Sequence, residues 1–175
     1  MALTVLIGGA RAGKSALAAK LATQAAVPVV FLATAEALDD EMRDRIARHR
    51  AERPTEWDTV EEPVDLEEAL AQVDPAHAII VDCVTLWVSN MMLKGLSDEE
   101  IAERATAASS LVARRPAPTF VVTNEVGSGV VPSTDLGRRF RDVLGRVNII
   151  WVEAATQALL VVAGRSIPLT SSELA

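Results

Sequence analysis

The chain is poor in cysteine and histidine, with one cysteine, Cys83, and two histidines among 175 residues. A lone thiol cannot form an internal disulfide, and the sequence has no Cys/His spacing typical of a metal site. No uninterrupted apolar run approaches the ~18 residues that a membrane-spanning helix needs. Residues 1–15 also lack the basic segment of a signal peptide. We therefore expect a cytoplasmic protein without a membrane span.

An excess of positive charge is missing as well, because 17 Lys and Arg face 24 Asp and Glu, giving a net charge of −7. This balance excludes a general nucleic-acid or anionic-membrane binder, although local basic clusters can still bind phosphates. Half of the residues are apolar and 23% are charged, which is typical of a folded globular protein. The length predicts a single domain over residues 1–175.

Short, nearly continuous apolar runs alternate with longer segments of helical spacing. Such runs favour strands buried on both faces, and strand–helix alternation favours the α/β class with a mostly parallel sheet flanked by helices. The predicted strands are Leu3–Gly8, Val29–Thr34, Ala78–Asp82, Thr119–Asn124 and Ala158–Gly164. The predicted helices are Lys14–Gln24, Asp39–Ala51, Asp65–Gln72, Ser97–Arg114 and Asp135–Asn148.

Three features concern the ends of these elements. Ser97 followed by Glu100 is typical of a capping box at a helix start. Asp65, after Pro63, is a candidate cap for another helix. The segment Arg165–Leu169 is expected to form a small C-terminal turn.

The strongest motif is GGARAGKS, Gly8–Ser15, which matches the P-loop pattern G-x-x-x-x-G-K-[ST]. Glycines let the backbone turn tightly and aim its N–H groups at a phosphate. The helix that begins near Lys14 adds its positive end, Lys14 supplies a mobile cation, and Ser15 offers an oxygen to Mg²⁺. The motif follows a predicted strand and opens a predicted helix, which is the context that a P-loop requires.

A P-loop also needs an acidic group for its metal ion, and Asp82 ends a predicted strand at the sheet edge where ligands gather. Asp82 could instead cap a helical segment after it, since aspartate favours that position too. Beside the P-loop we favour the first interpretation, with Ser15 and Asp82 as candidate Mg²⁺ ligands.

The predicted helix at residues 39–51 carries His49 among several arginines. Met42, Ile46 and His49 recur at helical spacing, so His49 should share the face turned toward the protein. A solvated, salt-bridged helix with a hydrogen-bonded histidine would account for this pattern. The alternative is a neutral imidazole that attacks a phosphorus atom, while Arg45, Arg48, Arg50 and Arg53 orient the phosphates. The other histidine, His77, is expected in an exposed loop.

With these motifs the chain resembles the bifunctional adenosylcobinamide kinase / adenosylcobinamide-phosphate guanylyltransferase family of cobalamin biosynthesis. The similar segments run in order through nearly the whole chain. They are GGARAGKS, ATAEALDDEMRDRIARHRAERPTEW, VDCVTLWVSNMM, TNEVGSGVVP, RFRD, GRVN and the closing LVVAG.

The resemblance implies a RecA-like P-loop NTPase fold and a homotrimer. It implies that ATP or GTP phosphorylates adenosylcobinamide, and that GMP then passes from GTP to the adenosylcobinamide phosphate through a GMP-histidine intermediate. The histidine matches His49. The implied nucleotide contacts are Gly8, Gly9, Ala10, Arg11, Ala12, Gly13, Lys14, Ser15, Thr34, Ala35, Glu36, Arg50, Ala51, Glu52, Arg53, Glu61 and Asp82.

Other interpretations stay open at this stage. A small-molecule kinase without guanylyltransferase activity would use the same P-loop and Asp82 but no special histidine. A GTPase switch is disfavoured, because the DxxG match at Asp142–Gly145 falls in a predicted helix and no NKxD motif exists. The segment Thr123–Pro132, with two glycines and a proline, is either a loop that covers the substrate or a plain connection.

Overall fold

The computed structural model describes residues 3–37 and 39–170, apart from the side chain of Arg45, and it holds one seven-stranded sheet. The strands lie in the order β3-β2-β4-β5-β1-β6-β7. All neighbouring pairs are parallel except β6 and β7, which pair antiparallel. The strands are β1 Leu3–Gly8, β2 Val29–Ala33, β3 Asp58–Glu61, β4 Ala78–Asp82, β5 Thr119–Asn124, β6 Gln157–Val162 and β7 Arg165–Leu169.

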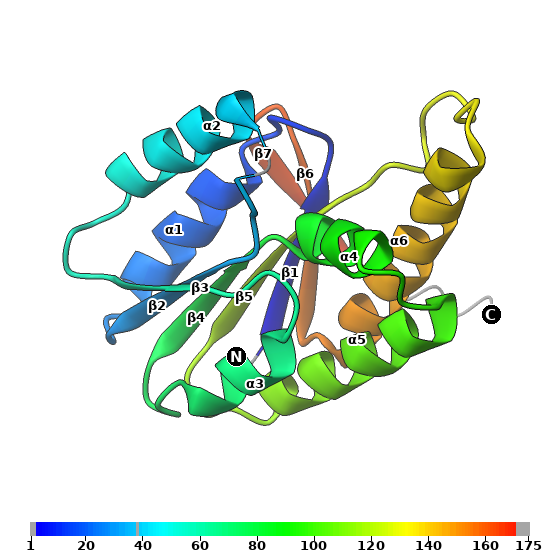
Figure 1. The fold of residues 1–175 in the computed structure, drawn as a ribbon. Helices are drawn as coiled ribbons and strands as arrows, with labels where there is room; N and C mark the ends of the chain where they lie inside the picture. The colour runs from blue at the N-terminus through cyan, green and yellow to red at the C-terminus, as the bar shows by residue number, and fades with distance from the viewer. Residues whose placement is uncertain (1–2, 38, 171–175) are drawn as a thin grey trace.

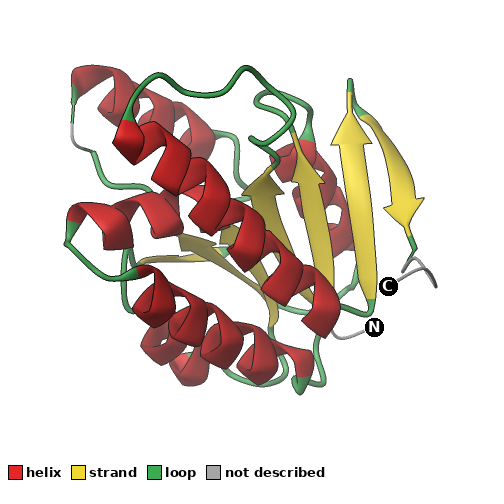
Figure 2. Ribbon diagram, turned by 90° about the vertical axis from the view of Figure 1, so that its right-hand side faces the viewer, coloured by secondary structure: helices red, strands yellow, loops and turns green. Residues whose placement is uncertain are grey.

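Helices cover both faces of this sheet, so the molecule has three layers (Figure 1). They are α1 Lys14–Gln24, α2 Asp40–Ala51, α3 Leu66–Gln72, α4 Val84–Leu93, α5 Asp98–Ala113 and α6 Asp135–Ala154. Figure 2 shows α5 and α6 crossing one face of the sheet, with the β6–β7 hairpin at one edge. This architecture confirms the predicted α/β class.

The core consists of two clusters, one on each side of the sheet, because neighbouring residues of a strand point to opposite faces. Leu6 and Val122 pack with Ala18 of α1 on one face. Val5 and Val121 belong to the larger cluster on the other face, which α3 to α6 cover. Burial on both faces explains why these strands are nearly continuous apolar runs.

The structure corrects several predicted boundaries. Residues 165–169 form the edge strand β7, since they pair antiparallel with β6, and are not a small turn. Helix α6 continues past Asn148 to Ala154, because no glycine or proline interrupts it there. The short strand β3 was not predicted, and α4 was considered only as the helical segment after Asp82, without bounds.

The two cap predictions have different outcomes. Ser97 and Glu100 form the predicted capping box at the start of α5. Asp65 occupies the N-cap position of α3, but its side chain makes no capping hydrogen bond. Its carboxylate instead pairs with Arg104 of α5 at 2.8 Å, so this residue ties two helices together.

None of the helices in the described part of the chain has the length and apolarity that would let it cross a lipid bilayer.

Candidate functional site

The P-loop joins β1 to α1 at the edge of the sheet where the parallel strands end. Gly13 is the N-cap of α1 and has φ +98°, a left-handed conformation that favours glycine. Gly8 is required for a different reason, because a Cβ there would lie 2.2 Å from the carbonyl oxygen of Val161 in β6. The motif therefore needs glycine at position 13 for the backbone conformation and at position 8 because there is no space for a Cβ.

The rest of the P-loop is held from within and from the neighbouring hairpin. Lys14 is buried, and its Nζ donates a hydrogen bond to the carbonyl oxygen of Gly9 at 2.7 Å. The N–H of Gly164, in the β6–β7 turn, donates to the carbonyl oxygen of Ala12 at 2.9 Å. Both contacts fix the shape of the loop. The N-terminal end of α1 then faces the cavity that is described below.

Asp82 is the last residue of β4, opposite Ala33 of β2 and Val122 of β5. Its Oδ2 is buried and has no hydrogen-bond partner among the described residues. The helix after it, α4, takes Cys83 as its N-cap, so the interpretation of Asp82 as that cap is wrong. A buried carboxylate oxygen without a partner is costly, and a bound cation would satisfy it.

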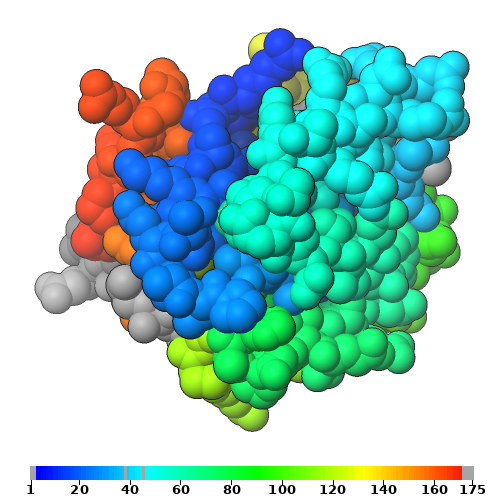
Figure 3. Space-filling view, turned by 90° about the vertical axis from the view of Figure 1, so that its left-hand side faces the viewer, coloured from blue at the N-terminus to red at the C-terminus, as the bar shows by residue number. Residues whose placement is uncertain are grey.

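Helix α2 places His49 against the protein, as its spacing predicted. Asp39 starts the helix by accepting a hydrogen bond from the N–H of Met42 at 2.7 Å. Met42, Ile46 and His49 are all partly buried and line one cavity together with the P-loop. In Figure 3, α2 (cyan) lies beside the P-loop and α1 (blue) on the same side of the molecule.

The arginines near His49 have separate roles. Arg53 stacks on Phe31, with its guanidinium carbon 3.6 Å from the ring centroid, and faces the same cavity. Burial lowers the pKa of Arg53, while the charge of Asp82 opposes that shift. Arg50 instead pairs with Glu61 at 2.6 Å near the surface. Arg48 is exposed, and the side chain of Arg45 lies outside the described residues.

The cavity between the P-loop, α2 and the ends of β2, β4 and β5 has a volume of about 400 Å³, and we call it the P-loop cavity. It brings together most of the predicted contacts, namely Ala10, Arg11, Ala12, Gly13, Lys14, Ser15, Ala35, His49, Glu52, Arg53, Glu61 and Asp82. The other predicted contacts, all described, lie outside its wall: Gly8, Gly9, Thr34, Glu36, Arg50 and Ala51. The structure thus gathers the P-loop, cations, three carboxylates and an imidazole around one cavity.

Thr34 has a structural place behind that wall. It is fully buried, and its Oγ1 donates to the carbonyl oxygen of Cys83 at 2.7 Å. Its own carbonyl oxygen accepts a hydrogen bond from Asn90 Nδ2 at 2.8 Å. Thr34 therefore links the ends of β2 and β4, and its side chain supports the cavity from outside.

Sequence reasoning missed several cavity residues, including Phe31, Cys83, Leu86 and Asn124. Phe31 and Leu86 look like ordinary core residues in the sequence, and only the tertiary structure shows that they line the cavity. Desolvation, with the nearby charge of Asp82, raises the pKa of the Cys83 thiol to about 11. A thiol that stays protonated at neutral pH is a poor nucleophile, so Cys83 contributes to the wall and not to the chemistry.

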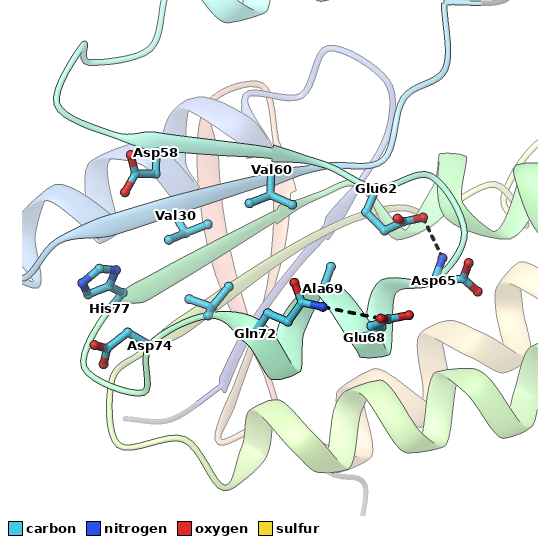
Figure 4. A pocket seen from close by; sticks show the side chains of 11 residues that line it. Val30, Asp58, Val60, Glu62, Asp65, Glu68, Ala69, Gln72, Asp74 and His77 are labelled. Atoms are coloured by element: carbon cyan, nitrogen blue, oxygen red, sulfur yellow. Dashed lines mark hydrogen bonds between the residues drawn. The ribbon is translucent and has the colours of Figure 1, made fainter.

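A second, larger cavity of about 630 Å³ lies beside the edge strand β3 and helix α3 (Figure 4). Its wall carries the carboxylates of Asp58, Glu62, Asp65, Glu68 and Asp74, and also His77. His77, expected to be exposed, is partly buried in the turn before β4. Among the residues that the structure describes, no lysine or arginine lines this cavity, so its charge opposes phosphate binding and the P-loop cavity is the candidate site.

Comparison with known proteins shows the family of the chain. The family model described as cobinamide kinase / cobinamide phosphate guanyltransferase matches residues 4–169. The chain belongs to this family. Among its curated relatives, the bifunctional adenosylcobalamin biosynthesis protein CobP of Pseudomonas aeruginosa is 39% identical over 97% of this chain and 98% of its own length. The bifunctional adenosylcobalamin biosynthesis protein CobU of Escherichia coli is 40% identical over 93% of this chain and 96% of its own length.

The fold of this cobinamide kinase / guanyltransferase family member also resembles solved structures of low sequence identity. A KaiC-like protein of Pyrococcus horikoshii aligns with a TM-score of 0.54 at 17% identity, over 91% of this chain and 70% of that one. The RadB recombinase aligns with a TM-score of 0.51 at 15% identity, over 91% of this chain and 73% of that one. At such identities the likeness concerns the fold alone, and it confirms the predicted RecA-like P-loop architecture.

Proposed function

We propose that this chain phosphorylates adenosylcobinamide with ATP or GTP and then transfers GMP from GTP to the product, giving adenosylcobinamide-GDP and pyrophosphate. Membership of the cobinamide kinase / cobinamide phosphate guanyltransferase family supports both reactions. The observation that carries the proposal is that Lys14 and His49 line the same cavity. A nucleotide held by the P-loop would then lie within reach of the imidazole.

In the kinase reaction, the hydroxyl oxygen of the substrate attacks the γ-phosphorus of the nucleotide. A new O–P bond forms, the bond from the γ-phosphorus to the β,γ-bridging oxygen breaks, and the nucleoside diphosphate leaves as the hydroxyl loses its proton. The backbone N–H groups of the P-loop and the Lys14 ammonium would stabilise the negative charge that builds on the phosphate oxygens. This role requires the loop shape that Gly8 and Gly13 permit.

In the guanylyltransferase reaction, a ring nitrogen of His49 attacks the α-phosphorus of GTP. The N–P bond forms as the α,β-bridging P–O bond breaks, and pyrophosphate leaves. An oxygen of adenosylcobinamide phosphate then attacks the same phosphorus and displaces the histidine. Arg53, which faces this cavity, would neutralise charge on the transferred phosphate.

Mg²⁺ is a further part of the proposal, and the residues present fit it. No three His, Cys, Asp or Glu side chains in the described ranges gather into a ready-made metal cage. Mg²⁺ commonly takes one or two protein oxygens and completes its shell with phosphates and water. Ser15 and the unpartnered carboxylate of Asp82 line the P-loop cavity and would supply those oxygens. The ion would neutralise phosphate charge.

Covalent labelling tests the histidine step directly. Incubation with α-labelled GTP and Mg²⁺ should attach label to the protein through an acid-labile, base-stable bond and release pyrophosphate. His49→Ala should lose the label, because it removes the attacking nitrogen, while His77→Ala is the matched control and should keep it. Full labelling of His49→Ala would remove His49 from the mechanism.

The same experiment separates the proposal from its nearest alternative. A P-loop kinase without guanylyltransferase activity would phosphorylate adenosylcobinamide and form no covalent nucleotide in any variant. If wild-type protein phosphorylates adenosylcobinamide but takes up no label from GTP, that alternative holds.

We further propose that the protein is a single cytoplasmic domain, that it assembles as a homotrimer and that it binds no nucleic acid. Exposed apolar side chains of the β6–β7 hairpin support self-association, because Val162 and Ile167 are 55% and 60% exposed in one chain. Sedimentation equilibrium tests the assembly: three chains of 18.6 kDa should sediment together, whereas a monomer at micromolar concentration would contradict it.

A further inference from the structure

Strand β5 ends in a polar residue of the TNEVGSGVVP segment to which the sequence analysis assigned no role. Asn124 is the last residue of β5 and lines the P-loop cavity. It lies opposite Gly8, the first residue of the P-loop, and the N–H of the next residue, Glu125, donates to the carbonyl oxygen of Gly8 at 3.1 Å. Asn124 is therefore on the strand adjacent to the phosphate-binding turn.

Asp82 lies on β4, the strand on the other side of β5 from the P-loop strand β1. Strand β5 lies between β1 and β4 in the sheet, and Asp82 pairs in register with Val122, two residues before Asn124. The side chain of Asn124 thus enters the cavity between the strand that leads into the P-loop and the strand that carries the candidate metal ligand. This is where the terminal phosphates of a P-loop nucleotide belong.

Buried polar side chains fix the backbone of Asn124 from two helices. Its N–H donates to Thr85 Oγ1 of α4 at 2.7 Å, and its carbonyl oxygen accepts from Asn148 Nδ2 of α6 at 3.0 Å. Thr123 Oγ1 in turn donates to Asn148 Oδ1 at 2.6 Å, which fixes the orientation of that amide. Thr85, Thr123 and Asn148 are all buried, so these hydrogen bonds form away from water.

The network holds the main chain of Asn124 and leaves its side chain available. Buried polar groups that are fully hydrogen-bonded make a rigid and specific arrangement. The carboxamide of Asn124 makes no hydrogen bond to any other residue within 3–37 and 39–170, so it can donate and accept toward the cavity. A fixed backbone with an uncommitted polar side chain is the arrangement that a substrate-contacting residue requires.

We propose that Asn124 is a catalytic residue of the kinase reaction, whose carboxamide N–H donates a hydrogen bond to an oxygen of the γ-phosphoryl group during transfer. This inference rests on the proposed function. Asn124 stays neutral throughout, and the bonds made and broken are those of the kinase step above. Its donor stabilises charge on the transferring group, which a neutral amide can do without proton exchange. Thr85 and Asn148 are positioning residues, because they act through the backbone of Asn124.

The proposal separates the two reactions of this protein. His49 approaches from α2 and attacks the α-phosphorus, whereas Asn124 approaches from β5 and contacts the γ-phosphoryl group. Loss of the Asn124 amide should therefore slow the kinase step and leave formation of the GMP-histidine bond nearly unchanged.

The main test compares wild type with Asn124→Ala in three measurements: kinase kcat and KM, nucleotide affinity, and labelling by α-labelled GTP. Removing one donor to a developing charge typically costs ~10²-fold in kcat, and we expect a loss of at least about tenfold here. The KM for nucleotide should stay within about threefold and the labelling within about twofold, which also shows that the variant folds. A kinase kcat within about twofold of wild type, or an equal loss in all three measurements, would overturn the proposal.

A second pair of variants tests the positioning network. Thr85→Val keeps the side-chain shape but removes the hydroxyl, whereas Thr85→Ser keeps the hydroxyl. Thr85→Val should lower kinase kcat several-fold with little change in KM, and Thr85→Ser should restore it. If Thr85→Val lowers only the thermal stability and leaves kcat unchanged, the network has no positioning role. Failure of the proposed function itself would look different, because wild-type protein would not phosphorylate adenosylcobinamide.

Discussion

Gly8 shows how a single residue can decide the geometry of the site. Its Cα faces the backbone of β6 so closely that a Cβ would lie 2.2 Å from the carbonyl oxygen of Val161. Real Cβ atoms do not approach backbone oxygens that closely, so β1 or β6 would have to move. Such movement would also displace the P-loop, which begins at this residue.

Replacing Gly8 by alanine should therefore destabilise the protein strongly. Forcing an extra carbon into a packed backbone contact costs about 1–3 kcal/mol or more, and we expect at least about 2 kcal/mol. Urea denaturation followed by circular dichroism measures the change. Gly9→Ala is the matched control, because nothing lies within 4 Å of its added Cβ, and it should change the free energy of unfolding by less than about 0.5 kcal/mol. Equal stability of the two variants would contradict the steric explanation.

The same scale explains which site residues the sequence could indicate. Lys14, Ser15 and Asp82 were predictable because a P-loop and a strand-terminal carboxylate have characteristic spacing. Phe31 was not, since an aromatic residue in a buried strand is ordinary until Arg53 is found stacked on it at 3.6 Å. The position of Asn124 in the cavity could not be predicted either, because its neighbours in space come from β1, α4 and α6.

At the scale of elements, the start of helix α5 was predicted correctly from local sequence, as a capping box. Ser97 Oγ accepts a hydrogen bond from the N–H of Glu100, and the Glu100 carboxylate accepts one from the N–H of Ser97. The hydrogen bond from the backbone N–H of Ser97, and next the Ser97 side chain, lower the pKa of Glu100, because they stabilise its charged carboxylate. Local capping of this kind needs no partner from elsewhere in the chain.

Removing this cap should have a moderate and purely structural effect. Ser97→Ala should lower the free energy of unfolding by about 1 kcal/mol, since N-cap substitutions typically cost 0.5–2 kcal/mol. Thr106→Ala, at an exposed position within the same helix, serves as the control and should be neutral or slightly stabilising. Thermal denaturation measures both variants, and nucleotide binding should remain that of wild type. A cap variant as stable as its control would argue that α5 depends on packing alone.

Other elements depended on contacts that local sequence does not reveal. Strand β3 is only four residues long, and its DTVE sequence has no apolar run, so pairing with β2 decides its conformation. Helix α4 has the mainly apolar sequence VTLWVSNMML, and most of its residues are buried. Such a segment does not distinguish a buried helix from a strand by periodicity alone.

At the scale of the whole molecule, the P-loop cavity draws its wall from segments spread between residues 10 and 124, and the C-terminal hairpin supports the P-loop. The β6–β7 turn supports the P-loop through Gly164, while α2 and the ends of β2, β4 and β5 complete the cavity. A ligand bound there contacts several elements at once. Binding should therefore stabilise the entire fold, because the unfolded chain lacks the cavity.

GTP with Mg²⁺ should accordingly raise the melting temperature. Ligand at a hundred times its Kd contributes about 2.7 kcal/mol, which corresponds to roughly 5–10 °C for a domain of this size. Lys14→Ala should lose most of that shift, because it removes the cation of the P-loop. Lys20→Ala, an exposed position of the same helix α1, should keep the full shift. Equal shifts in both variants would show that the nucleotide binds elsewhere.

The sequence by itself determined the α/β class, the position of the P-loop and the face of α2 that carries His49, because these follow from local spacing and hydrophobic periodicity. Only the tertiary structure decided the strand order, the antiparallel edge strand β7 and the fixed position of Asn124. These depend on contacts between residues far apart in the chain, such as Asn124 with Asn148 and Gly8 with Val161. Local sequence patterns do not indicate which distant segments of the chain come into contact.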